Sequence, residues 1–216
     1  VVSLCVGSEL VLVSPVKVVQ TLFTVLFDPD FLKTVWYSAA RILGGFFTAL
    51  TLGTVLGWVA SRFWIVETLL RPITAVIKAT PVASFIILVL LWFSGKNLSV
   101  IISMLMVFPV IYMNVLEGIR SADEELLEMA QVFRLSVSKK LLYIYLPAVA
   151  PFFVSACSVS LGLCWKSGIA AEVIGTPDGS IGAVFYQAKI FLQTSELLAW
   201  TVVVAVSYTH LTLPTK

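Results

Sequence analysis

The stretch "LSVIISMLMVFPVIYMNVL", residues Leu98 to Leu116, decides the fold of this chain because it contains no charged residue. A helix that crosses a bilayer needs about 20 mostly apolar residues, and this stretch has that length and character. Further segments match the same pattern at residues 34–60, 73–93 and 146–165. The sequence therefore predicts an all-α membrane protein, built as a polytopic bundle of transmembrane helices.

The composition of the whole chain supports the same class of protein. Of the 216 residues, 59% are hydrophobic and only 12% are charged. A soluble domain carries about 25% charged residues, so this chain has too few to cover a water-facing surface. The net charge of +2 at pH 7 is too small to indicate nucleic-acid binding, and we expect membrane lipid to surround the chain instead.

The two ends of the chain need separate treatment. Residues 1–13 are expected to be the end of a truncated first span, and residues 197–205 the start of a truncated sixth. Residues 1–205 would then form one transmembrane domain of about six helices. The tail "VSYTHLTLPTK", residues 206–216, begins with six residues that resemble one reading frame of a common sequencing adapter. We therefore expect residues 206–216, with the only histidine, to be an adapter-derived artefact and exclude them from the fold prediction.

A stripe of small residues runs along the second predicted span. Gly45, Ala49, Gly53 and Gly57 recur every four residues, which places them on one face of a helix. Small side chains allow another helix to approach closely. The stripe therefore predicts either a seam with a second copy of the chain or tight packing within one subunit.

A charged residue and two prolines interrupt the apolar spans. Arg41 lies near the start of its span, where a charge either serves function or extends to the membrane surface. Pro81 and Pro109 each remove a backbone hydrogen bond, so they predict kinks in the third and fourth spans. Such kinks suit a solute pathway or a hinge, and they also occur as plain structural kinks. The candidate pathway or gating residues are Arg41, Pro81, Pro109, Trp165 and Glu172.

Basic residues give a limited indication of orientation. Arg62 and Arg71 flank the loop after the second span, and further basic residues lie between Arg120 and Lys140. Two predicted spans separate these loops, so both should lie on the same side, and basic loops favour the cytoplasm. Lysines on the opposite side nearly balance this excess, so charge alone does not fix the orientation.

Residues 121–146 form a polar island between the fourth and fifth spans. Ser121 and Glu124 have the spacing of a capping box, and acidic residues crowd the first turns, where the helix dipole favours them. Apolar residues then recur at helical spacing up to Phe133, and a second short helix is expected to begin near Ser136 or Ser138. The island therefore predicts a helical hairpin, which either caps the bundle or docks a soluble partner.

No recognisable catalytic or nucleotide-binding motif occurs in the sequence. It contains no G-x-x-x-x-G-K-[ST] loop and no glycine pattern of a dinucleotide-binding fold. The three cysteines lie in apolar runs without the spacing of metal ligands. We therefore expect no catalytic residue, no metal, no cofactor and no enzyme activity in this chain.

The stretch "EMAQVFRLSVSKKLLYIYLP", Glu128 to Pro147, resembles the EAA signature of binding-protein-dependent ABC importer permeases. That signature reads E-A-A, three residues, G, nine residues, I, any residue, L-P. Arg134 occupies the glycine position, and Met129 replaces the first alanine. The segments "TPVASFIILVLLWF" (80–93) and "LGLCWKSGIAAEVIG" (161–175) resemble the nitrate, sulfonate and taurine branch of that family.

This resemblance implies a MetI-like fold in a multi-pass protein of the bacterial inner membrane. Two permease copies would form the pathway, a dimer of ABC ATPase subunits would hydrolyse ATP, and an extracytoplasmic binding protein would deliver the solute. That solute would be nitrate-, sulfonate- or taurine-like, or a thiamine precursor. The residues implied in coupling to the ATPase are Glu128, Met129, Ala130, Phe133, Arg134, Ile144, Leu146 and Pro147.

The alternative, a self-contained channel or secondary carrier, would need a filter, an inverted repeat or midplane charges, and the sequence shows none of these.

Two further expectations depend on the resemblance. If the family glycine adopts a positive φ, Arg134 costs about 1 kcal/mol at that position. If the bend lies elsewhere, that cost vanishes and the guanidinium can pair with an acidic residue of the ATPase. Residues 168–195 are expected to form an extracytoplasmic loop, with Glu172 near a helix end. That loop would gate the pathway, meet the binding protein or only link two spans.

Overall fold

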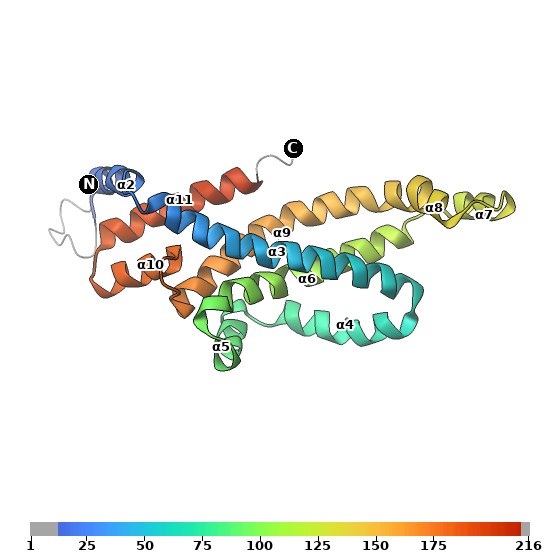
Figure 1. Ribbon diagram of the computed structural model, residues 1–216, viewed down its shortest axis with the longest axis horizontal. Helices are drawn as coiled ribbons and strands as arrows, with labels where there is room; N and C mark the ends of the chain where they lie inside the picture. The colour runs from blue at the N-terminus through green and yellow to red at the C-terminus, as the bar shows by residue number, and fades with distance from the viewer. Residues whose placement is uncertain (1–12, 213–216) are drawn as a thin grey trace.

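The protein is an elongated bundle of helices in a computed structural model that describes residues 13–212 (Figure 1). Every regular element in this range is helical. In chain order these are α2 (Pro15–Leu26), α3 (Phe31–Arg62), α4 (Trp64–Ala79), α5 (Val82–Trp92), α6 (Gly95–Arg120), α7 (Glu124–Val132), α8 (Val137–Lys140), the π-helix η1 (Leu141–Tyr145), α9 (Leu146–Gly175), α10 (Ile181–Ile190) and α11 (Thr194–Thr212). The all-α prediction is therefore confirmed.

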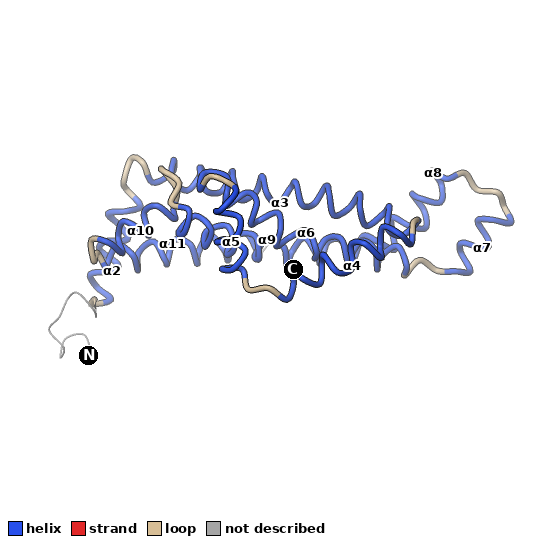
Figure 2. The backbone as a smooth tube through the Cα atoms, turned by 90° about the horizontal axis from the view of Figure 1, so that it is seen from below, coloured by secondary structure: helices blue, strands red, loops and turns tan. Residues whose placement is uncertain are grey.

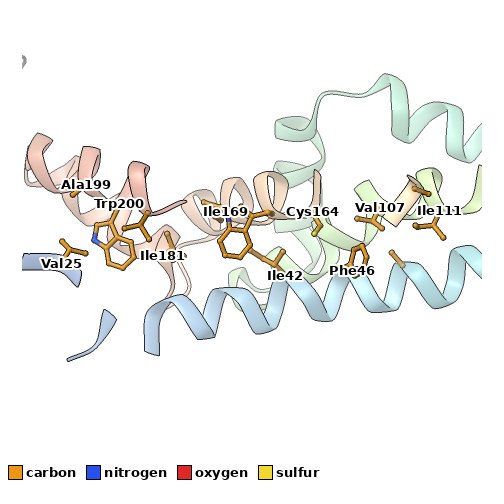
Figure 3. Packing of buried hydrophobic residues seen from close by; sticks show 14 of the residues in the cluster. Val25, Ile42, Phe46, Val107, Ile111, Cys164, Ile169, Ile181, Ala199 and Trp200 are labelled. Carbon is orange, nitrogen blue, oxygen red and sulfur yellow. The ribbon is translucent and has the colours of Figure 1, made fainter. Parts of the chain in front are cut away.

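Three long helices form the centre of the bundle. Helices α3, α6 and α9 run side by side along the long axis, and α6 lies between the other two in the packing (Figures 1 and 2). Their shared core contains Ile42 and Phe46 of α3, Val107 of α6, and Cys164 and Ile169 of α9 (Figure 3). These apolar side chains hold the three helices in register.

The expected count of about six spans is not confirmed within the described residues. Within residues 13–212, three helices are long and apolar enough to cross a membrane: 31–62, 95–120 and the continuous 137–175. Helices α4 and α5 would add a fourth only as one broken span, since they are bent by 110°. The first expected span, 1–13, lies almost wholly outside the described residues, and the segment expected to begin the sixth lies within α11.

The predicted kink at Pro81 is a complete break between α4 and α5. Thr80 has a ψ of 132° and Pro81 a ψ of 137°, so both residues are extended. A proline disfavours the α conformation of the residue before it, which explains why α4 ends at that point. At Pro109, in contrast, α6 continues without a break.

The small-residue stripe packs within one subunit. A Cβ atom built on Gly45 would lie 2.9 Å from Cβ of Ser103, and one on Gly53 would lie 3.0 Å from Cβ of Ile111. Both neighbours belong to α6. The structure therefore decides between the two interpretations of the stripe, because α6 of the same chain occupies the face that a second copy would need.

The expected long loop at residues 168–195 is wrong. Helix α9 continues to Gly175, and α10 begins at Ile181, so the true connection is short. Gly168 is buried, and an added Cβ would lie 2.7 Å from Oγ of Ser103. Gly168, Gly175 and Gly182 therefore mark close helix packing, whereas Gly179, with a φ of 76°, lies in the short connection.

The ends of the described chain pack against each other. Helix α2 begins with Pro15 in the first turn and lies against α11. Helix α11 continues past residue 205 to Thr212, and Nζ of Lys166 lies 4.4 Å from the ring centroid of Tyr208. The artefact assignment of residues 206–216 and the boundary at residue 205 stay predictions.

Candidate functional site

The predicted hairpin protrudes from one end of the bundle. Figure 1 shows α7 and α8 beyond the turn that joins α3 to α4. This end of the molecule carries Arg62, at the end of α3, and Arg120, at the end of α6. The two basic loops therefore lie at the same end, as the number of intervening spans predicted.

The N-cap of α7 is Asp123, so the predicted capping box is wrong by two residues. One carboxylate oxygen of Asp123 accepts a hydrogen bond from the backbone N–H of Glu125, at 2.9 Å. Ser121 instead ends α6, where its hydroxyl donates to the carbonyl of Gly118 at 2.9 Å. Serine and aspartate both cap helix N-termini well. Because α7 begins at Glu124, the residue directly before it, Asp123, is the cap.

The inner face of the hairpin is a small buried cluster. Ala130 has no exposed surface, and Ile144 is only 7% exposed. These two side chains pack with Ala122, Leu127 and Leu135. Two of the residues implied in coupling therefore anchor α7 against η1 and α9 instead of facing a partner.

The outer face of the hairpin is apolar and exposed. Met129, Val132 and Phe133 are 46%, 79% and 72% exposed. Glu128 is also exposed beside them. We call Met129, Val132 and Phe133 the hairpin tip. A protruding apolar tip on an anchored helix is suited to insertion into a partner's pocket.

Arg134 adopts a left-handed backbone conformation, with a φ of 49°. Its N–H donates to the carbonyl of Gln131 at 3.1 Å, and the N–H of Leu135 donates to that of Ala130 at 2.9 Å. This pair of bonds is a Schellman motif, whose left-handed position favours glycine. The geometry therefore explains why the family pattern has glycine where this chain has arginine.

The Leu146-Pro147 pair follows a π-helical turn. The N–H of Leu146 donates to the carbonyl of Leu141, five residues earlier, and Pro147 lies in the first turn of α9. A proline ring inside a helix clashes with the carbonyl four residues before it, and a wider π turn relieves that clash. The pair therefore sets the join between the hairpin and α9.

A cluster of buried and half-buried polar side chains lies near the opposite end of the bundle. The hydroxyl of Ser38 donates to a carboxylate oxygen of Glu172 at 2.6 Å and accepts from the N–H of Ile181 at 2.9 Å. Nε of Arg41 donates to Oγ of Ser99 at 3.3 Å, and Nη1 donates to the hydroxyl of Tyr37 at 3.0 Å. We call Tyr37, Ser38, Arg41, Ser99 and Glu172 the polar cluster.

Two charged atoms of the polar cluster keep unused hydrogen-bonding capacity. Within the described part of the chain, Nη2 of Arg41 and Oε1 of Glu172 are buried without a hydrogen-bond partner. Buried polar atoms are normally satisfied by protein or water. The cluster therefore has both a donor and an acceptor available for a polar molecule.

The structure unites only two of the five candidate pathway residues. Arg41 and Glu172 meet in the polar cluster, whereas Pro81 is exposed at the bend between α4 and α5. Trp165 is buried in the core, with its indole N–H donating to the carbonyl of Val204 at 3.3 Å. Sequence reasoning missed Ser38, although its position three residues before Arg41 places both on one helix face.

A bundle of long apolar helices with a protruding polar hairpin indicates an integral membrane protein. Residues 49–215 match the family described as "Binding-protein-dependent transport system inner membrane component". This match covers more than half of the chain, so the chain belongs to this family of ABC transporter permeases. It is a multi-pass protein of the bacterial inner membrane, and its family consists of transport subunits.

Two curated relatives resemble nearly the whole chain. It is 29% identical to the "Putative aliphatic sulfonates transport permease protein SsuC" of Bacillus subtilis, covering 93% of this chain and 73% of the relative. It is 27% identical to the "Taurine transport system permease protein TauC" of Escherichia coli, covering 92% and 74% respectively. These relatives agree with the branch that the sequence suggested.

A solved structure shows the same fold. A crystal structure of an amino acid ABC transporter with histidines superposes with a TM-score of 0.65, over 90% of this chain and 92% of the other. The two chains are 16% identical. The likeness confirms the importer-permease fold.

Proposed function

We propose that this chain forms the solute pathway of an ATP-driven importer and that its hairpin, residues 121–146, docks the ATPase subunit. The observation that carries the proposal is the construction of the hairpin. Its inner side chains, Ala130 and Ile144, are buried, whereas Val132 and Phe133 at its tip are largely exposed. An apolar surface on a protruding, anchored element indicates a partner protein.

Helix α9 supplies the connection between docking and transport. It has 30 residues, which corresponds to a length of about 45 Å. The hairpin joins its first turn through η1, and Glu172 of the polar cluster lies near its last turn. A displacement of the hairpin by the ATPase would therefore move Glu172 relative to Ser38 and Arg41 on α3.

The proposed solute is a small organic sulfonate or taurine-like compound. The names of the two relatives support this class. The unpaired Nη2 of Arg41 offers a donor to an anionic group, and arginine binds such planar or trigonal oxygen sets well. Nitrate and thiamine precursors remain within the proposal because the same branch of permeases includes them. Two copies of this chain and a solute-binding protein complete the proposed assembly.

A matched pair of phenylalanines tests the docking role. Phe133 at the hairpin tip and Phe191 at the end of α10 are 72% and 71% exposed. Phe133→Asp is expected to lower co-purification of the ATPase subunit about tenfold or more, since it removes an apolar anchor. Phe191→Asp makes the same chemical change at the other end and should leave co-purification unchanged.

Quantitative pull-down of the ATPase subunit from detergent extracts measures this difference. Uptake into vesicles should fall with the same variant. If Phe133→Asp retained the ATPase subunit as well as Phe191→Asp does, the hairpin would not be the docking element. Glu128→Lys should also weaken association with the ATPase subunit. If it does not, the acidic side of the hairpin has no role in docking.

A further inference from the structure

A groove with a basic rim lies beside the root of the hairpin. Two adjoining cavities of about 440 and 470 Å³ share Trp58, Ile119, Leu141 and Tyr145 in their walls. These volumes are in the range of ordinary ligand sites, about 300–1,000 Å³. The walls come from the last part of α3, the end of α6 and the segment from α8 to α9.

The polarity changes along the groove. One end is lined by aliphatic side chains such as Leu142 and Val149, with Thr54, whose hydroxyl is already bonded to the carbonyl of Leu50 at 2.7 Å. The other end carries Arg62 and Lys140. The groove therefore has an apolar end and a cationic end.

The cationic end of the groove has no acidic partner within the described residues. No aspartate or glutamate lines either cavity. The ion pairs found in this part of the chain join Lys33 to Asp30 and Arg120 to Glu67, so the nearby Glu67 is already occupied. Arg62 and Lys140 therefore remain available to an anionic group.

We propose that this groove binds one anionic phospholipid, with an acyl chain between Trp58 and Leu142 and the phosphate at Arg62 and Lys140. Basic pockets between transmembrane helices on the cytoplasmic side attract anionic headgroups. Trp58 and Tyr145 have the amphipathic rings that membrane interfaces favour. If the hairpin docks the ATPase subunit, this groove lies on the cytoplasmic side of the membrane. The location of the groove therefore rests on the proposed function.

A second copy of the chain fits this groove less well. A twofold interface brings the same patch of both copies together. Two such grooves would place Arg62 and Lys140 near their own counterparts, without an acidic residue in the walls to compensate. The charge pattern therefore favours a lipid phosphate over a symmetric protein contact.

The position of the lipid links it to coupling. Leu141 and Tyr145 belong to η1, the π turn between the hairpin and α9, and Lys140 ends α8. The opposite wall is the end of α3. A bound lipid would therefore hold the hairpin root against α3 while leaving the hairpin tip free.

Lipid retention on the purified full-length chain tests the site. Phosphatidylglycerol should remain bound to the wild type through detergent washing, as measured by native mass spectrometry. The double variant Arg62→Gln, Lys140→Gln should lower this retention about tenfold or more, because both basic residues attract the anionic headgroup. The control Arg71→Gln, Lys139→Gln removes the same charge from exposed positions outside the groove and should retain the lipid.

A charge-neutral variant provides an independent measurement. Leu142→Trp fills the apolar end of the groove and should also release phosphatidylglycerol. Equal retention in the groove and control variants would overturn the proposal. A disulfide between two chains through Leu142→Cys, formed in detergent without lipid, would assign the groove to a second copy instead. Lipid retention needs no ATPase subunit, so its failure leaves the docking proposal intact, and failed docking leaves lipid retention unchanged.

Discussion

Arg134 is the residue whose backbone departs most clearly from its preferred conformation in the hairpin. Its positive φ is part of the Schellman motif that ends α7. A residue with a Cβ in this conformation costs about 1 kcal/mol relative to glycine. Of the two alternatives for Arg134, the structure shows the positive φ with its energetic cost. The arginine side chain is exposed.

Arg134→Gly is expected to stabilise the end of α7 by about 1 kcal/mol and to leave transport and ATPase association largely intact. Slower amide hydrogen exchange in α7 would measure the gain. Leu192 provides the matched control, because it has a φ of 53° at the end of α10. Leu192→Gly should protect α10 and leave α7 unchanged. Loss of ATPase binding in Arg134→Gly would show that the guanidinium itself contacts the partner.

Helices α3 and α6 owe their close packing to small residues on one face of α3. Gly45 lies on that face, and an added Cβ would lie 2.9 Å from Cβ of Ser103 and still closer to the carbonyl oxygen of Val100. The adjacent Gly44 has no neighbour within 4 Å of an added Cβ. Gly45 therefore lies in a tight helix contact, whereas the adjacent Gly44 faces open space.

Gly45→Ala should lower the thermal unfolding temperature of the chain in detergent, because two backbones would have to separate. Overpacking of this kind costs about 1–3 kcal/mol. Gly44→Ala is the control and should leave that temperature unchanged or raise it, since alanine is preferred to glycine within a helix by up to about 1 kcal/mol. The same loss of stability in both variants would contradict the assignment of this helix face to α6.

At the scale of the whole molecule, the two candidate sites lie at opposite ends of α9. The hairpin joins its beginning, and Glu172 lies near its end, bonded through Ser38 to the first turn of α10. Substitutions in the hairpin should therefore change ATPase docking, whereas substitutions in the polar cluster should change solute passage. This separation distinguishes a coupled transporter from a bundle that merely carries two unrelated surfaces.

Arg41→Gln and Glu172→Gln are expected to lower solute uptake about tenfold or more while leaving ATPase co-purification unchanged. The reason is that each substitution removes a charged group that holds the cluster together, Arg41 through Ser99 and Tyr37 and Glu172 through Ser38. Lys33→Gln is the control, because Lys33 is exposed at the same end of α3. Uptake in reconstituted vesicles measures the effect. Wild-type uptake in both cluster variants would exclude the polar cluster from the pathway.

The sequence by itself determined the membrane class, the positions of the main apolar helices and the place of the hairpin. These features are local: a long uncharged run such as Leu98 to Leu116 identifies a membrane helix wherever it packs. The offsets from Glu128 to Pro147 likewise identify the hairpin without any distant contact. At Arg134 the sequence left two alternatives open, and the structure shows the one with a positive φ.

Only the tertiary structure decided which faces meet and which polar groups come together. Ser38 and Glu172 are 134 positions apart in sequence, yet their side chains share a hydrogen bond. The glycines at Gly168 and Gly175 looked like loop residues because a glycine suits both a turn and a close helix contact. The physical reason is that periodicity describes one helix at a time, whereas burial and hydrogen bonding depend on neighbours that only the fold brings together.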